Sequence, residues 1–102
     1  SQLEGMVVKP ESFSIKTLVE RNINILSAQI ADKGLRVEND IDDATLLWAD
    51  KNMINVVFRN IISNSIKFCK ENDAIFIKSS LTEGKVIIAV QDTGIGIPQE
   101  KL

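Results

Sequence analysis

The chain has 102 residues, which is enough for one domain, and its 44% hydrophobic and 25% charged residues are typical of a globular protein. A net charge of −2 gives no electrostatic reason to expect a nucleic acid or an anionic membrane as partner. The sequence contains no histidine and one cysteine, Cys69, which excludes histidine-based catalysis and an internal disulfide and disfavours a zinc site. It also contains no P-loop motif and no run of about 18 apolar residues.

The first elements expected along the chain are a short strand and a helix. Residues 6–9 are a short apolar run before Pro10 and form a candidate edge strand. Ser12 or Ser14 can cap a helix that ends at Gly34. The apolar residues of this helix repeat with the helical period: Ile15, Leu18, Val19, Ile23, Leu26 and Ile30.

Four further segments are expected to be strands. Residues 35–41 alternate between apolar and polar side chains, and residues 45–49 are a short apolar run. Residues 74–81 and 85–91 form a hairpin around a turn that contains glycine. One helix precedes these strands and another separates the second from the third. This order predicts an α+β fold, a two-layer sandwich with helices on one face of a mixed, mostly antiparallel sheet.

Residues 50–70 are expected to form one long helix, because Asp50 is a good N-cap and no Pro or Gly follows it. One face is expected in the core: Ile54, Val57, Phe58, Ile61, Ser65 and Phe68. A second face is expected in solvent: Asn52, Asn55, Arg59, Ser63 and Lys70. Between them lie Asn60, Asn64 and Lys67. Amide oxygens suit a hard cation and an ammonium suits phosphate, although an ordinary wet flank of an amphipathic helix carries the same residue types.

Near the C-terminus, an acidic residue and two glycines interrupt a β-branched run. Gly94 and Gly96 allow the backbone to turn sharply and to approach a ligand closely. Asp92 stands at the expected strand end, where its carboxylate can accept a hydrogen bond from an exocyclic amine. Taken alone, this motif is also compatible with any turn from a strand into a loop.

In this order, residues 60–68 and 92–98 resemble the N box and the first glycine box of the ATP-binding domain of sensor histidine kinases. The wider superfamily, known as Bergerat or GHKL, includes gyrase, mismatch-repair ATPases and large heat-shock chaperones. Further landmarks of the family fall at residues 10–14, 31–34 and 48–50. The resemblance implies that residues 8–102 are the N-terminal portion of this domain, whose C-terminal part is missing. It also implies that residues 1–7 are a linker from a preceding dimerisation domain.

The resemblance implies ATP and Mg²⁺ as cofactors. The nucleotide-binding residues that it implies are Asn60, Asn64, Lys67, Phe68, Asp92, Gly94 and Gly96. In these roles Asn64 coordinates the metal, Asn60 supports it from one turn earlier, and Lys67 contacts the phosphates. Asp92 accepts from the adenine amino group, and the two glycines shape the pocket wall. Phe68 lies near the nucleotide, with a plain core position as the alternative.

The implied function is that of the ATP-binding catalytic domain of a sensor histidine kinase. Such a domain transfers the γ-phosphate of ATP to a histidine on a neighbouring domain in two-component signalling. Hydrolytic relatives carry a water-activating Glu where Asn60 stands, and because an amide is no general base, phosphotransfer is favoured. An ATP-hydrolysing clamp of the gyrase or chaperone branch, and a degenerate signalling module without catalysis, are the alternatives.

The resemblance further implies two partners, a histidine-containing dimerisation domain of the same protein and a response regulator. It implies a cytoplasmic location, in a sensor bound to the membrane, and a chain that is inactive by itself. Without further strands beside it, the segment 85–91 would be an open edge of high β-propensity. The expectation is therefore that the chain self-associates through this edge.

Overall fold

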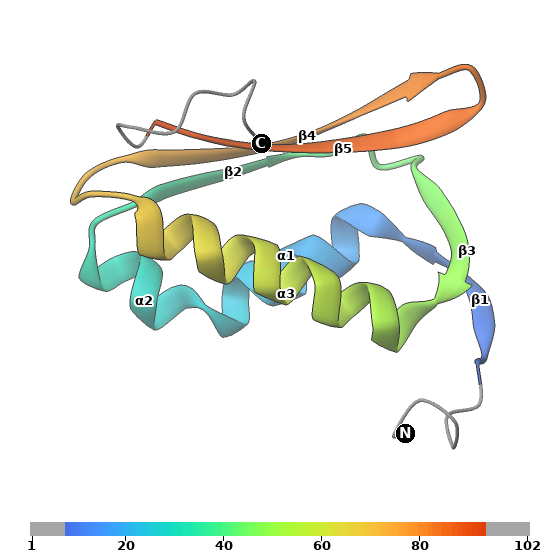
Figure 1. Cartoon of the computed structure of the whole chain (residues 1–102), viewed down its shortest axis with the longest axis horizontal. Helices are drawn as coiled ribbons and strands as arrows, with labels where there is room; N and C mark the ends of the chain where they lie inside the picture. The colour runs from blue at the N-terminus through green and yellow to red at the C-terminus, as the bar shows by residue number, and fades with distance from the viewer. Residues whose placement is uncertain (1–7, 94–102) are drawn as a thin grey trace.

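The structure is a computed structural model that describes residues 8–93. A layer of helices covers one face of a sheet, as Figure 1 shows. This is the two-layer α+β sandwich that the sequence predicts. Within the described residues, no helix is long and apolar enough to cross a membrane.

The strands form two sheets. β2 (Arg36–Asp40), β4 (Ala74–Thr82) and β5 (Lys85–Asp92) form a three-stranded sheet in the order β2-β4-β5. β2 is parallel to β4, and β5 is antiparallel to β4. β1 (Pro10–Ser14) and β3 (Leu46–Asp50) form a separate antiparallel pair at one end of the molecule (Figure 1). With one parallel pairing among antiparallel ones, the prediction of a mixed, mostly antiparallel arrangement is confirmed.

The first strand begins later than expected. Of the candidate strand 6–9, residues 6 and 7 lie outside the described residues, while residues 8 and 9 precede β1. Pro10 opens the strand, a position that proline tolerates because its missing N–H is not needed there. Phe13 is buried and fixes the strand to the core, whereas Val8 is 61% exposed.

The expected helix up to Gly34 is divided in two. The Ser14 hydroxyl caps α1 (Ile15–Ile25), and α2 (Ser27–Asp32) follows directly. The two helices bend at Leu26, whose N–H still bonds to the carbonyl of Asn22 at 3.1 Å. The Asn22 side chain also donates to a backbone carbonyl one turn earlier in α1, a local bond that favours such bends.

The long helix and its cap are confirmed. α3 spans Lys51–Phe68, and one carboxylate oxygen of Asp50 accepts the N–H groups of Asn52 and Met53 at 3.0 and 3.2 Å. The second oxygen accepts the N–H of Lys9 at 3.1 Å. These three backbone donors, Lys9 first, lower the pKa of the Asp50 carboxyl because they stabilise its charged form.

The roll of α3 about its axis differs from the expectation. Phe58, Ile62 and Ile66 are buried in one cluster with the apolar residues of β4. Val57 and Ile61, which the pattern assigns to the core, are 49% and 40% exposed. That assignment is wrong because apolar residues surround most of this helix, so the helical period alone does not choose between two neighbouring stripes.

A polar network between α1 and α3 explains which stripe is buried. Asn22 is 0% exposed, and its amide donates to the side-chain oxygen of Asn55 at 2.8 Å. The Asn22 oxygen accepts from Arg59 Nε at 2.7 Å. Asn55 and Arg59 were expected in solvent, but both are half-buried against α1. Because a buried amide must be hydrogen-bonded, this network holds the Asn55–Arg59 side of α3 against α1.

Candidate functional site

The open face of α3 carries most of the predicted nucleotide ligands. Asn60, Asn64 and Lys67 are all exposed. They lie one turn apart along the side of the helix that points away from its buried stripe. Phe68 is 62% exposed, so its assignment to the core is wrong, and the roll of the helix places it beside the other three. The structure thus gathers four predicted site residues on one accessible surface.

The C-terminal end of β5, where Asp92 stands, lies at the same end of the molecule as the C-terminus of α3 (Figure 1). Asp92 is the last residue of β5 and is half-buried. Two hydrogen bonds fix this strand end, from Thr93 N–H to the Ala74 carbonyl at 3.0 Å and from Ala74 N–H to Thr93 Oγ1 at 2.9 Å. Burial raises the pKa of the Cys69 thiol, and the negative charge of Asp92 raises it further. α3 and β5 also pack against each other.

The C-terminal ends of α3 and β5 therefore lie at the same end of the fold, and Lys67 and Phe68 are the last residues of one element and Asp92 of the other. Asn60 and Asn64 extend the exposed surface of α3 along the helix. Gly94 and Gly96, predicted to shape the pocket wall, lie outside the described residues.

The donor set fits a metal that arrives with its nucleotide. Among residues 8–93, no group of three or more His, Cys, Asp or Glu side chains could hold a metal ion. Mg²⁺ keeps several waters and is usually held by one or two protein oxygens plus substrate phosphates, so it needs no such cage. The amide oxygen of Asn64 can supply one ligand, and Lys67 can neutralise phosphate charge beside it.

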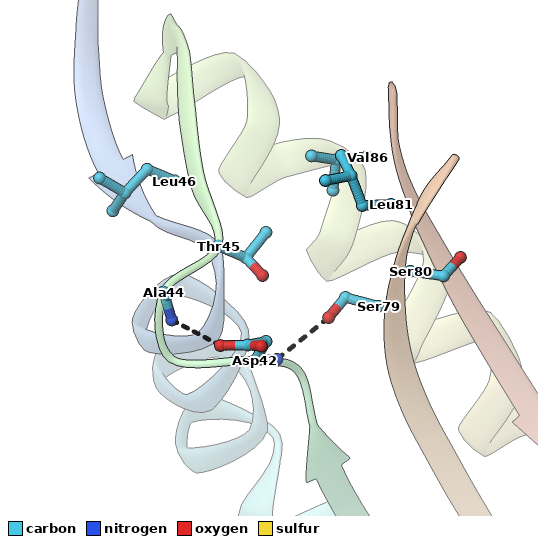
Figure 2. Close-up of a pocket in the computed structure, with 8 residues that line it drawn as sticks. All are labelled: Asp42, Ala44, Thr45, Leu46, Ser79, Ser80, Leu81 and Val86. Carbon is cyan, nitrogen blue, oxygen red and sulfur yellow. Dashed lines mark hydrogen bonds between the residues drawn. The ribbon is translucent and has the colours of Figure 1, made fainter. Parts of the chain in front are cut away.

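A cleft of ≈ 390 Å³ lies elsewhere, between residues 42–46 and the β4–β5 hairpin (Figure 2). The N–H of Asp42 donates to Ser79 Oγ at 3.0 Å and joins its two walls. Its apolar lining includes Leu46, Leu81 and Val86. None of the predicted nucleotide-binding residues lines this cleft, so it is separate from the candidate site.

One residue at the candidate site was not predicted. Lys33 reaches the C-terminal end of α3 with its ammonium group and bonds to three backbone carbonyls there. The signal in the sequence is a lysine directly before Gly34 at an expected helix end, a position where cations are favourable. The sequence pattern does not reveal that Lys33 bonds to the end of α3 rather than to the end of α2, the helix that it follows.

These features belong to an α+β domain in which an exposed helix face carries amides and a lysine, and a strand ends in an acidic residue. The chain belongs to the HATPase_c family, described as histidine kinase-, DNA gyrase B- and HSP90-like ATPases, and residues 49–102 match it. The prediction of family and fold is confirmed.

Two named histidine kinases are similar to the chain. The adaptive-response sensory kinase SasA of Gloeothece citriformis is 37% identical over 75 residues, which are 72% of this chain and 19% of that protein. The solved catalytic domain of histidine kinase ThkA matches with a TM-score of 0.80 and 24% identity, covering 90% of this chain and 63% of that one. A structure of ThkA in complex with the response regulator TrrA also has a TM-score of 0.80 and 24% identity, covering 98% and 30%. The chain therefore spans about a fifth of the curated relative.

Proposed function

We propose that this chain is the ATP-binding part of a sensor histidine kinase, and that the complete protein transfers the γ-phosphate of ATP to a histidine. The observation that supports the proposal is that Asn64 and Lys67 are exposed on α3 of a HATPase_c fold, and that α3 ends at the same end of the molecule as β5, whose last residue is Asp92. Asn64 would hold Mg²⁺ through its amide oxygen, and Asn60 would support it from one helical turn earlier. Lys67 would bind phosphate oxygens. Asp92 would accept from the adenine amine, and Phe68 would lie against the nucleotide.

The rival functions have less support. A hydrolytic clamp needs a general base to activate water, and the matching position is the neutral amide Asn60. A module without nucleotide chemistry would not need to keep Asn64, Lys67 and Asp92 at the motif positions of an ATPase family.

The proposal includes partners outside the chain. The sequence has no histidine, so the phosphate acceptor would lie on a dimerisation domain of the same protein, to which residues 1–7 would be the linker. Residues 8–102 would be the N-terminal portion of the catalytic domain, and Gly94 and Gly96 part of its pocket. The complex of ThkA with a response regulator supports a response regulator as the second partner. The proposed location is the cytoplasmic side of a membrane-bound sensor.

The substitution Asp92→Asn tests the proposal in the complete protein. Given γ-labelled ATP, the unmodified protein is expected to acquire label that is labile to acid and stable to base, as phosphohistidine is. In Asp92→Asn, an amide N–H group faces the N–H groups of the adenine amine, so the hydrogen bond is lost. Losing a buried hydrogen-bond partner costs about 1–3 kcal/mol, and ATP affinity should therefore fall about tenfold or more. Calorimetry measures this affinity directly.

Asp40→Asn is the matched control, because Asp40 is an exposed aspartate at the end of a different strand. This variant should keep full affinity and full labelling. Unchanged ATP affinity in Asp92→Asn would refute the role of Asp92, and ATP consumption without any protein-bound label would favour the hydrolytic reading.

We also propose that the chain by itself self-associates through β5, which is an edge strand of the described sheet. Ile87 is exposed, whereas Ile88 is half-buried and paired with Ser79. Ile87→Lys should therefore shift the 102-residue chain toward monomer without unfolding it, because a charge on an edge strand opposes pairing. Light scattering measures the change, and a monomeric unmodified chain at high micromolar concentration would refute the proposal.

A further inference from the structure

Lys33 lies where the last turn of α3 lacks backbone partners. Its ammonium donates to the carbonyl oxygens of Ile66 at 2.7 Å, Lys67 at 3.2 Å and Cys69 at 2.9 Å. The final carbonyls of an α-helix have no partner inside the helix and need one from outside. A glycine in the left-handed conformation often supplies this cap, but Cys69 follows α3 in an extended conformation. Lys33 takes the place of such a cap.

The charge of Lys33 strengthens this arrangement. A cation at a helix C-terminus is favourable because the aligned peptide dipoles leave partial negative charge there. Hydrogen bonds from a charged donor are shorter and stronger than neutral ones. The helix end is therefore held more firmly than by solvent alone.

The backbone around Lys33 is itself fixed to the loop that follows α3. The carbonyl of Lys33 accepts the N–H of Asn72 at 2.8 Å. Gly34 adopts φ +63°, and a Cβ at this position would lie 2.8 Å from the side-chain oxygen of Asn72. The left-handed conformation favours glycine here, whereas the Asn72 side chain could turn away from a Cβ. The turn after α2 and the loop after α3 interlock, with the Lys33 side chain crossing between them.

We propose that Lys33 is a positioning residue for nucleotide binding, acting through the last turn of α3. Lys67 and Phe68 are the last two residues of that helix, and Lys33 bonds to the carbonyl of Lys67 itself. By holding this turn helical, Lys33 keeps Lys67 and Phe68 on the exposed face of α3. It touches no nucleotide. This inference rests on the proposed function, since it assigns a role within the same site.

The substitution Lys33→Met in the complete protein tests the proposal. It keeps the apolar stem and removes every donor, so the last turn of α3 should loosen. The KM for ATP should rise about tenfold, while phosphorylation at saturating ATP stays within about twofold. Lys33→Arg should recover most of the affinity, because guanidinium N–H groups can reach the same carbonyls. Lys78→Met, at an exposed lysine on β4, is the control and should leave both quantities unchanged.

Hydrogen exchange of backbone amides supplies a second measurement that does not depend on nucleotide. In Lys33→Met, residues 67–70 should exchange about tenfold faster, whereas residues 58–62 in the middle of α3 keep their protection. Equal acceleration in both segments would mean general destabilisation and would overturn the proposal, as would unchanged exchange at 67–70. If the unmodified protein binds no ATP, the proposed function fails, and the exchange result still decides whether Lys33 holds the helix end.

Discussion

Asn64→Ala in the complete protein is expected to weaken Mg-ATP binding roughly 10- to 100-fold, the range that corresponds to losing one polar contact to a charged group. Stability should change by less than about 1 kcal/mol, because Asn64 is exposed and alanine has the higher helix propensity. Calorimetric titration with ATP in excess Mg²⁺ measures the first quantity. Thermal unfolding of the same sample measures the second.

Two comparisons make this result specific to the metal. Asn52→Ala removes an exposed asparagine from another side of α3 and should leave Mg-ATP affinity unchanged. When the titration is repeated with a chelator, the ATP affinities of Asn64→Ala and of the unmodified protein should become similar, because the amide then has no cation to hold. An equal loss of affinity with and without Mg²⁺ would show that Asn64 acts on the nucleotide directly.

Local signals in the sequence were sufficient to predict most elements of this fold, but not the division of the first helix, the first strand or all of the contacts. The N-cap at Asp50 and the absence of Gly or Pro located α3, because capping and propensity act within one helix. The parallel pairing of β2 with β4 joins segments that are far apart in the chain, so no local pattern encodes it. The roll of α3 depends on Asn22, a buried asparagine on a different helix.

The candidate site shows the same division. Asn64, Lys67 and Asp92 belong to short motifs and could be named from the sequence, with their spatial placement following from the fold. Lys33 could not be named from the sequence, because a lysine at a helix end usually interacts with the carbonyls of that helix. Here the three carbonyls lie at the C-terminal end of α3. The exposure of Phe68 follows from the roll of α3, so the helical pattern could not predict it either.

The largest stability effect is expected from Ile62→Ala. Ile62 is 0% exposed and belongs to the central apolar cluster. Truncating a fully buried isoleucine to alanine removes its apolar contacts and leaves a cavity, which typically costs about 2–5 kcal/mol of the free energy of unfolding. For a domain whose total stability is about 5–15 kcal/mol, this loss is enough to lower the denaturant midpoint sharply. Urea denaturation of the complete protein, followed by a signal from this domain, measures it.

Ile61→Ala is the matched control, because it makes the same chemical change one residue earlier in the same helix. Ile61 is 40% exposed, so less apolar surface is lost, no closed cavity forms, and the higher helix propensity of alanine offsets part of the cost. The expected loss is below about 1 kcal/mol. Ile61 was expected in the core, so the two variants decide between the two stripes. Greater destabilisation by Ile61→Ala than by Ile62→Ala would mean that α3 is rolled the other way, with the candidate site turned from the open face toward α1.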